Sequence, residues 1–393
     1  MPIAARMIPR MTAFAVIKDM FEAGRKLKAE HGAENVCDFS IGNPDVPPPE
    51  AFHRALCETV AAGPLDHGYA PLTGHLPVRQ ALSRRLRDEH GIDVPPELVL
   101  MTVGASGALN DILHTLVDPG EEIVTPAPYF LGYENYAFLA GARLVAVPTD
   151  DRFHLDPSAV AAALTGRTRV VLINSPNNPS GAVYTASELQ ALGRVLEDGS
   201  RRHGRRIYLV ADEPYRLITY GVPVPSVFAA YPHTVVINSF SKELSLAGER
   251  LGYLAVHPQA EDAGEILATA AAVNSMLVVN APSLFQRLVV KVEGARVDIE
   301  PYRRRRELIC GILRQAGYEF SEPEGAFYLF PKSPIADDAR FTEMLKQELI
   351  LVSPGRAFGT PGYFRISYAV PENTLVQSKA GFERAMQKAR AGG

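Results

Sequence analysis

Short apolar runs recur through the middle of the chain, and stretches with helical spacing or turn residues separate most of them. The runs cover residues 98–103, 122–125, 143–147, 169–174, 207–211, 235–238 and 251–256. Each run is continuous rather than alternating, which is typical of strands that are covered on both faces. The pattern therefore predicts an α/β fold, built on a mostly parallel seven-stranded sheet covered by helices.

A different pattern begins near residue 283. A long helical stretch leads through Cys310, and short apolar runs follow at 327–330, 351–353 and 364–369, before a last amphipathic helix from Glu372. This order predicts a smaller α+β domain. Near the other end, residues 14–31 have helical spacing behind an N-terminal arm, and a proline-rich turn up to Pro49 marks a domain boundary.

Ligands of parallel sheets bind beyond the carboxyl ends of the strands, so the residues after each run carry the candidate chemistry. After the first run, Gly104, Ala105 and Ser106 open a predicted helix, whose free N–H groups suit a phosphate. Their spacing does not match Gly-x-Gly-x-x-Gly, which argues against a dinucleotide-dependent oxidoreductase. After the second run, Phe130 could stack on a flat heteroaromatic ring.

Polar residues follow the fourth and fifth runs. Residues 174–181 read Asn-Ser-Pro-Asn-Asn-Pro-Ser-Gly, a tight loop that favours a cis peptide bond and in which Asn178 can donate to a ring or carboxylate oxygen. Asp212 directly follows an apolar run, so its buried carboxylate needs a partner, such as a protonated pyridinium nitrogen. Tyr215 could reach a phenolic oxygen on the same ring.

Residues 239–252 read Ser-Phe-Ser-Lys-Glu-Leu-Ser-Leu-Ala-Gly-Glu-Arg-Leu-Gly. Lys242, if partly dehydrated, can attack a carbonyl carbon and form a Schiff base. Ser239, Ser241 and Arg250 would then surround an anion and suit a phosphate. An aldehyde and a phosphate on one small molecule describe pyridoxal 5′-phosphate (PLP).

These features also have ordinary structural interpretations. Lys242 can be a solvated surface lysine, Asp212 a helix cap, and Tyr69 a half-buried residue that covers the core. The spacing Ser239-x-x-Lys242 also occurs in acyl-serine enzymes, but their partner motifs Lys-Thr-Gly and Ser-Asp-Asn are absent here.

Composition narrows the class of protein. The 393 residues suggest about two domains. A net charge of -4 and no apolar run of membrane-spanning length predict no binding to nucleic acid or membrane. The three cysteines are far apart, so we expect neither a disulfide framework nor a metal site, and a reducing, cytoplasmic location.

Taken together, the motifs resemble those of fold-type I PLP-dependent aminotransferases of class I/II, a family that includes aspartate and alanine aminotransferases. The resemblance rests on the Lys242 stretch, the 174–181 loop, Asp-Glu-Pro-Tyr at 212–215 and Phe-Arg-Ile-Ser-Tyr-Ala at 364–369. In this family both termini lie in the small domain. The resemblance therefore implies residues 1–48 as the arm and part of the small domain, 49–285 as the large PLP-binding domain and 286–393 as the small C-terminal domain.

The resemblance also implies site residues. Lys242 would carry PLP as a Schiff base and shuttle a proton, Asp212 would pair with the pyridinium nitrogen, and Arg365 would clamp the substrate α-carboxylate. The Gly42 N–H and Asn178 would help Arg365, and Tyr69 would reach the partner subunit's phosphate in a homodimer. The remaining cofactor contacts would come from Gly104, Ala105, Ser106, Phe130, Asn178, Tyr215, Ser239, Ser241 and Arg250.

The implied reaction moves an amino group from an L-amino acid to a 2-oxo acid, with 2-oxoglutarate as the expected acceptor. This chain departs from the family at three places: it has no tryptophan, so Phe130 is the stacking ring; Glu249 precedes Arg250; and Ser106 stands where acid-specific relatives can carry lysine. A C–S or β-eliminating lyase and an oxidase on the same fold remain alternatives. A transcriptional regulator of this fold would need a further DNA-binding domain, for which 393 residues leave no room.

Overall fold

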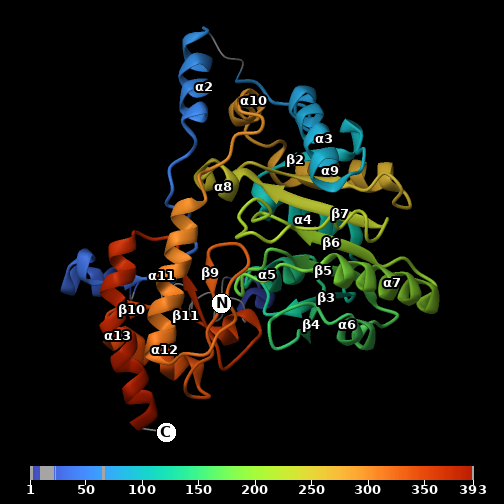
Figure 1. Cartoon of the computed structure of the whole chain (residues 1–393). Helices are drawn as coiled ribbons and strands as arrows, with labels where there is room; N and C mark the ends of the chain where they lie inside the picture. The colour runs from blue at the N-terminus through green and yellow to red at the C-terminus, as the bar shows by residue number, and fades with distance from the viewer. Residues whose placement is uncertain (1–2, 9–21, 23, 64–66, 392–393) are drawn as a thin grey trace. The chain divides into compact units, whose positions relative to one another are not determined.

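The computed structural model describes residues 3–8, 22, 24–63 and 67–391, which fall into two units (Figure 1). The larger unit consists of Asn43–Pro301 and Pro323–Ala326, and the smaller unit of the described residues up to Gly42, Tyr302–Glu322 and the chain from Phe327 onward. The smaller unit is therefore discontinuous. Residues 43–48, 286–301 and 323–326, which the resemblance implied for the smaller domain, belong to the larger unit.

All seven predicted runs are strands of one sheet in the larger unit. The strands are β2 (Val99–Thr102), β3 (Glu122–Ala127), β4 (Arg143–Pro148), β5 (Thr168–Asn174), β6 (Tyr208–Asp212), β7 (Thr234–Ser239) and β8 (Gly252–Val256). Their order is β2-β8-β7-β6-β5-β3-β4. Only β8 is antiparallel to its neighbours, so the prediction of a mostly parallel seven-stranded sheet is confirmed.

Burial of the strands explains their continuous apolar sequences. Every residue of β6, β7 and β8 is buried, whereas β4, at the sheet edge, is partly exposed. Helix α4 packs against β7 and β8, α9 against β2, and α6 against β3 and β4. The helices of this unit are α2 (Glu50–Ala61), α3 (Leu76–His90), α4 (Gly104–Leu116), α5 (Tyr133–Leu139), α6 (Pro157–Ala163), α7 (Ala186–His203), α8 (Phe240–Glu243), α9 (Ala263–Val278) and α10 (Ser283–Lys291).

Helix α7 illustrates how local sequence sets these elements. Thr185 and Glu188 form a capping box at its start, because the side chain of each accepts a hydrogen bond from the backbone N–H of the other. Gly204 ends the helix in the left-handed conformation, at φ 65°. Between these ends, Leu189, Leu192 and Leu196 recur at helical spacing and are buried.

The smaller unit is α+β, as predicted. Strands β1 (Cys37–Asp38) and β10 (Ile350–Leu351) pair in parallel, and β11 (Ser353–Pro354), β12 (Phe364–Ser367) and β9 (Tyr328–Leu329) form an antiparallel sheet. Its long helices are α11 (Glu300–Ala316), α12 (Asp338–Gln347) and α13 (Glu372–Ala391). Residues 24–31 are helical. The rest of the helix predicted at 14–31, and most of the predicted arm, lie outside the described residues.

The prediction of one long helix from residue 283 through Cys310 is wrong. Helix α10 ends at Lys291, and α11 begins at Glu300. Gly294 lies between them at φ 81°, a conformation that helices do not use. Pro301 lies in the first turn of α11, where its missing N–H costs nothing. Among the described residues, no helix is long and apolar enough to span a membrane.

Packing of α7 predicts a strong effect at Gly193. A Cβ at this position would lie 2.2 Å from the backbone oxygen of Ala230, so α7 would have to move. We expect Gly193→Ala to lower the free energy of unfolding by about 1–3 kcal/mol in urea denaturation. Gly264 of α9 is the matched control, because a Cβ there meets nothing within 4 Å. Gly264→Ala should be neutral or stabilising by about 0.4–1 kcal/mol, and equal losses in both variants would contradict the packing argument.

Candidate active site

Three predicted polar residues end three neighbouring strands. Asn174 is the last residue of β5, Asp212 of β6 and Ser239 of β7. The strand register aligns Asp212 with Asn174 on one side and with Ile237 on the other. Because the three strands are parallel, their polar ends gather at one edge of the sheet.

Asp212 is the buried acid at this edge. Its Oδ2 accepts a 2.8 Å hydrogen bond from the hydroxyl of Tyr133, and its backbone oxygen accepts one of 2.7 Å from Asn174 Nδ2. Its Oδ1 has no hydrogen-bond partner among the residues that the structure describes. Burial raises the pKa of Asp212 to about 7, although the Tyr133 hydroxyl counteracts this, and the nearby Glu213 raises it further. A buried carboxylate with a raised pKa can bind a cation or a charged N–H donor, which stabilises its ionised form.

The 174–181 loop brings Asn178 toward Asp212. The Asn178 N–H donates a 2.7 Å hydrogen bond to Asn174 Oδ1, and Asn174 itself binds the Asp212 backbone. The Ser175-Pro176 and Asn178-Pro179 bonds are both cis, as the sequence favoured for this loop. The loop is therefore tied to the end of β6 through one shared asparagine.

Arg250 lies over the start of α4. A Cβ on Gly104 would come within 2.6 Å of Arg250 Nη2, so only glycine lets the guanidinium approach so closely. A Cβ on Gly252 would likewise meet the Gly104 backbone at 2.6 Å. Arg250 itself has φ 55°, a left-handed conformation that is uncommon outside glycine. A fixed cation and the free N–H groups of a helix start together form an anion site.

Lys242 and Tyr215 lie close to each other. Lys242 belongs to the short helix α8 and is partly buried, with its Nζ 5.9 Å from the centre of the Tyr215 ring. Tyr215 is buried, as are Ser239 and Ser241 on either side of Phe240. The lysine amine thus has limited hydration, which is the condition under which it can act as a nucleophile.

Two tyrosines of α5 belong to this site and were not predicted. Tyr133 binds Asp212 and packs edge-on against Phe130, with ring centroids 5.7 Å apart. Burial raises the Tyr136 pKa, while the Ser106 side chain and Arg250 lower it, so both lie near this hydroxyl. Tyr133 and Tyr136 are three residues apart in a helix that begins beyond a strand's carboxyl end, and this spacing was the available signal.

Tyr69 is not part of this cluster of buried residues. Its side chain is 88% exposed, so the alternative in which it covers the core is wrong. The neighbouring Ala70 N–H donates a 3.2 Å hydrogen bond to Asn280 Oδ1, which ties the Tyr69 loop to the end of α9.

Arg365 and Gly42 belong to the smaller unit. The Arg365 guanidinium lies 4.8 Å from the ring centres of both Tyr328 and Phe358, and its Nη2 donates a 2.6 Å hydrogen bond to the Ser40 backbone oxygen. A Cβ on Gly42 would lie 1.9 Å from the Tyr328 hydroxyl, so packing requires glycine there. The two aromatic rings hold a planar cation of the kind that binds carboxylates bidentately.

The larger unit therefore contains what PLP requires. The Asp212 oxygen that lacks a partner in the described part of the chain suits a protonated ring nitrogen, the Arg250–Gly104 site suits a phosphate, and Lys242 suits an aldehyde. These residues and the sheet define the class: a PLP-dependent enzyme of fold type I.

Comparison with known proteins narrows this class to a family. The sequence model of aminotransferases of class I and II matches residues 34–378, and the chain belongs to this family. The chain is 34% identical to the aspartate/prephenate aminotransferase of Thermus thermophilus, over 89% of this chain and 91% of that protein. It is 31% identical to aromatic-amino-acid aminotransferase 2 of Thermococcus litoralis, over 91% of this chain and 93% of that protein.

Solved structures agree with the sequence comparison. The crystal structure of an aminotransferase from Eubacterium rectale superposes with a TM-score of 0.95 at 39% identity, and the match covers 99% of each chain. The protein is thus an aminotransferase that uses PLP, and its substrates are an amino acid and a 2-oxo acid.

Because the pKa of Asp212 is raised, we expect this carboxylate to lower the folding stability of the protein without PLP, by an amount that depends on pH. The unfolded-state pKa is about 3.9, and the folded-state pKa is about 7. The folded state therefore keeps a proton that the unfolded state loses, and stability from this group falls as the pH rises from about 4 to about 7. Asp212→Asn removes the cost, so at pH 8 it should raise the free energy of unfolding by about 2–4 kcal/mol.

The measurement is urea denaturation of the apoprotein at pH 4 and pH 8. Asp111 also has a pKa raised by burial to about 7, but it is present in both proteins, so its contribution cancels in the difference. The gain from Asp212→Asn should disappear near pH 4. An equal gain at both pH values would show that ionisation of Asp212 is not its cause.

Proposed function

We propose that this aminotransferase binds PLP covalently at Lys242 and uses the same side chain to move the substrate α-proton. The buried Asp212 carboxylate, with one oxygen lacking a partner among the described residues, is the observation that carries the proposal. A site of this kind is costly unless a cation occupies it.

The chain's own residues supply binding, orientation and proton transfer. PLP, when bound, supplies an aldehyde that condenses with amines and a protonated ring that takes up the electrons released at the substrate α-carbon. Asp212 holds the ring nitrogen protonated, and Tyr133 holds the Asp212 carboxylate in place. Arg250 and the start of α4 bind the phosphate, together with Ser239, Ser241 and the segment Gly104, Ala105 and Ser106.

Three further side chains complete the proposed cofactor site. Phe130 stacks on the ring face, and Tyr215 and Asn178 bind its phenolic oxygen. The contact of Lys242 with the Tyr215 ring and the tie between Asn178 and the end of β6 support these roles. Tyr136 adds a fourth, because Ser106 and Arg250, both proposed to bind the phosphate, each lower the pKa of its hydroxyl and so lie near it.

Arg365 binds the substrate α-carboxylate in this proposal, with help from Asn178 and the Gly42 N–H. Its guanidinium is buried between two aromatic rings, where water competes poorly for a carboxylate. The Ser40 backbone oxygen accepts a hydrogen bond from Nη2 of Arg365, so the plane of the guanidinium keeps a defined direction.

For the substrates, we propose 2-oxoglutarate as the amino-group acceptor. The relatives named above act, by their names, on aspartate, prephenate and aromatic amino acids, so both acidic and aromatic donors belong in the first panel. Ser106 is neutral where acid-specific relatives can carry lysine, which supports a donor range wider than aspartate alone. The cytoplasmic location stays a prediction from composition.

The role of Lys242 predicts the outcome of a single half-reaction. PLP-loaded protein is mixed with single L-amino acids and no 2-oxo acid, and the visible absorbance of the bound cofactor is followed. We expect stable conversion to the aminated cofactor with one equivalent of 2-oxo acid, because no acceptor regenerates the starting form. Lys242→Ala should lower the conversion rate by about 10⁴-fold or more, since the proton transfer loses its base.

Two results would contradict this proposal. Release of ammonia, thiol or peroxide while the band returns would assign the protein to lyases or oxidases. Full conversion by Lys242→Ala would remove the role given to Lys242.

We also propose a homodimer in which Tyr69 reaches the partner's phosphate site. Tyr69 and Leu72 are exposed, and so is the consecutive run Met276, Leu277, Val278 and Val279 at the end of α9. The Ala70–Asn280 hydrogen bond connects these two exposed apolar segments. Contiguous exposed apolar residues of this kind mark protein–protein interfaces, and a two-fold dimer places the same patch on both chains.

The dimer predicts complementation between two inactive variants. Lys242→Ala and Tyr69→Ala should each have little activity alone. Mixed and reassociated at equal amounts, they should recover about a quarter of wild-type activity, because half of the dimers are hybrids with one intact site each. Sedimentation checks that dimers form. No recovery in a mixture shown to contain hybrids would contradict the proposed position of Tyr69.

A further inference from the structure

Buried charged residues connect the segment that carries Lys242 with the segment that carries Asp212. Each of the two residues is followed directly by a glutamate, Glu243 and Glu213, and these carboxylates are only 4% and 2% exposed. Both face α3. Buried carboxylates are costly unless they are paired, so the partners of these two residues are structurally constrained.

Arg85 of α3 is the partner of Glu243. Its two terminal nitrogens each donate to one carboxylate oxygen of Glu243, a paired geometry that fixes orientation as well as distance. Its Nε donates to Glu89 Oε1 at 2.8 Å, one helical turn further along α3. The pKa of Arg85 is far above its ordinary value: burial alone would lower it, and Glu243 outweighs that effect.

The connection continues from Glu89 to the Asp212 segment. Arg216 Nε lies 3.7 Å from Glu89 Oε2, and its Nη1 lies 3.2 Å from Glu213 Oε2. His90 Nε2, at the end of α3, lies 3.4 Å from the same Glu213 oxygen. Helix α3 thus contacts both segments, through Arg85 on one side and through Glu89 and His90 on the other.

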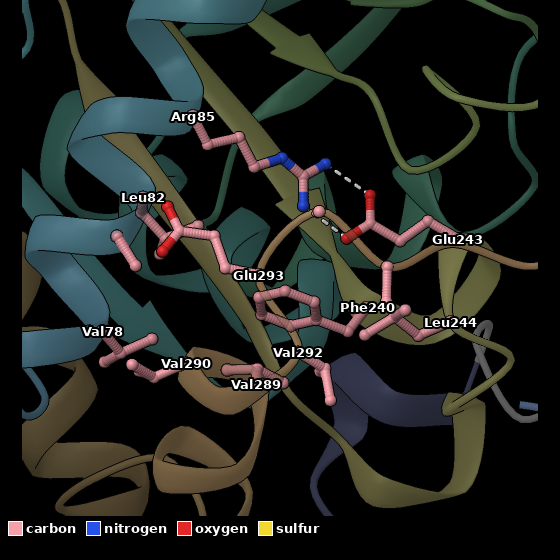
Figure 2. A pocket seen from close by; sticks show the side chains of 13 residues that line it. Val78, Leu82, Arg85, Phe240, Glu243, Leu244, Val289, Val290, Val292 and Glu293 are labelled. Atoms are coloured by element: carbon pink, nitrogen blue, oxygen red, sulfur yellow. Dashed lines mark hydrogen bonds and ion pairs between the residues drawn. The ribbon is translucent and has the colours of Figure 1, made fainter. Parts of the chain in front are cut away.

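Because of the packing behind α8, the Arg85–Glu243 ion pair affects the position of this helix more than a single ion pair usually does. Helix α8 is only four residues long, so it has little internal hydrogen bonding of its own. Behind it lies a cavity of about 40 Å³, walled by Val78, Leu82, Phe240, Leu244, Val289 and Val292. Figure 2 shows Arg85 and Glu243 facing each other at this cavity, joined by two contacts. Since apolar packing on this side is incomplete, directional contacts matter more for the position of α8. They are the Arg85–Glu243 ion pair and two backbone hydrogen bonds, from the Val297 N–H to the Glu243 oxygen and from the Phe240 N–H to the Leu251 oxygen.

We propose that Arg85 is a positioning residue of the aminotransferase reaction: it holds Lys242 through Glu243 and aligns it with the Asp212 segment through Glu89 and Arg216. The proposal rests on the proposed role of Lys242. Arg85 touches neither substrate nor cofactor in this arrangement. It sets the orientation of α8, and therefore how far the Lys242 amine is kept from water.

Adjacent arginines of α3 allow a matched test. Arg84 also forms a paired contact with a glutamate, Glu293, at 2.8 and 3.2 Å, but that pair is half-exposed and does not involve α8. We compare Arg85→Lys with Arg84→Lys, because lysine keeps the charge and loses the paired geometry. The readouts are the pH titration of the visible absorbance of bound PLP, kcat, KM, and the urea midpoint of the apoprotein.

Arg85→Lys should move the midpoint of the PLP titration upward by about half a pH unit or more, because a looser α8 lets water reach the Lys242 amine and favours its protonated form. It should lower kcat about tenfold or more with a smaller change in KM. Arg84→Lys should match the wild-type protein in both. A lower urea midpoint of Arg85→Lys with an unchanged titration and kcat would overturn the proposal, because the pair would then be structural only.

Glu243→Gln provides a second test that remains useful if Arg85→Lys does not fold. It keeps the side-chain shape and loses the paired contact, so positioning predicts an upward shift of the titration midpoint. A purely electrostatic effect predicts a downward shift, since a negative charge near the amine is removed. A downward shift or no shift overturns the proposal.

Lys242→Ala is included to separate the two proposals. If its bound PLP titrates as in the wild-type protein, the role of Lys242 itself is wrong. If its titration is lost while Arg85→Lys and Glu243→Gln behave as Arg84→Lys does, only the positioning role of Arg85 is wrong.

Discussion

The candidate active site is organised around one unfavourable interaction, the burial of the Asp212 carboxylate at the end of a fully buried strand. In water the group would ionise freely, but here burial raises its pKa to about 7 and one of its oxygens has no partner among the described residues. Tyr133 and Asn174 fix the acid without neutralising it. In the proposed site a cationic ring nitrogen would supply the missing charge, so the destabilisation of the apoprotein and the affinity for PLP would have the same physical origin.

The two sides of the sheet edge have different roles: one forms an anion site, and the other anchors the segments that carry Asp212 and Lys242. At the carboxyl edge of the sheet, glycines at 104 and 252 let Arg250 and the start of α4 come close enough to form an anion site. Behind the edge, α3 pairs with the glutamates that follow Asp212 and Lys242. In each of the pairs Asp212–Glu213 and Lys242–Glu243, the first residue is a proposed site residue. The glutamate that follows it anchors the segment to helix α3.

Much of the site could be predicted because its chemistry lies in residue types at strand ends. Lys242 and Asp212 follow apolar runs, Arg250 directly precedes one, and the structure confirms these runs as strands. Tyr133 and Tyr136 were missed because a tyrosine inside a short helix looks like core packing until its hydroxyl partner is known. Arg85 and Glu89 were missed for a related reason: an arginine and a glutamate one turn apart are the usual pattern of an exposed helix face, and only their burial shows otherwise.

The strand positions, the fold class and the family motifs could all be predicted from the sequence, because they follow from short-range patterns of apolar, small and polar residues. The sequence did not determine the break between α10 and α11, the limits of the two units, the exposure of Tyr69, or the partners of Glu213 and Glu243. Each of these depends on which segments meet after the chain has folded. Arg85 and Glu243 are 158 positions apart, and their pairing arises only when α3 packs beside the end of β7.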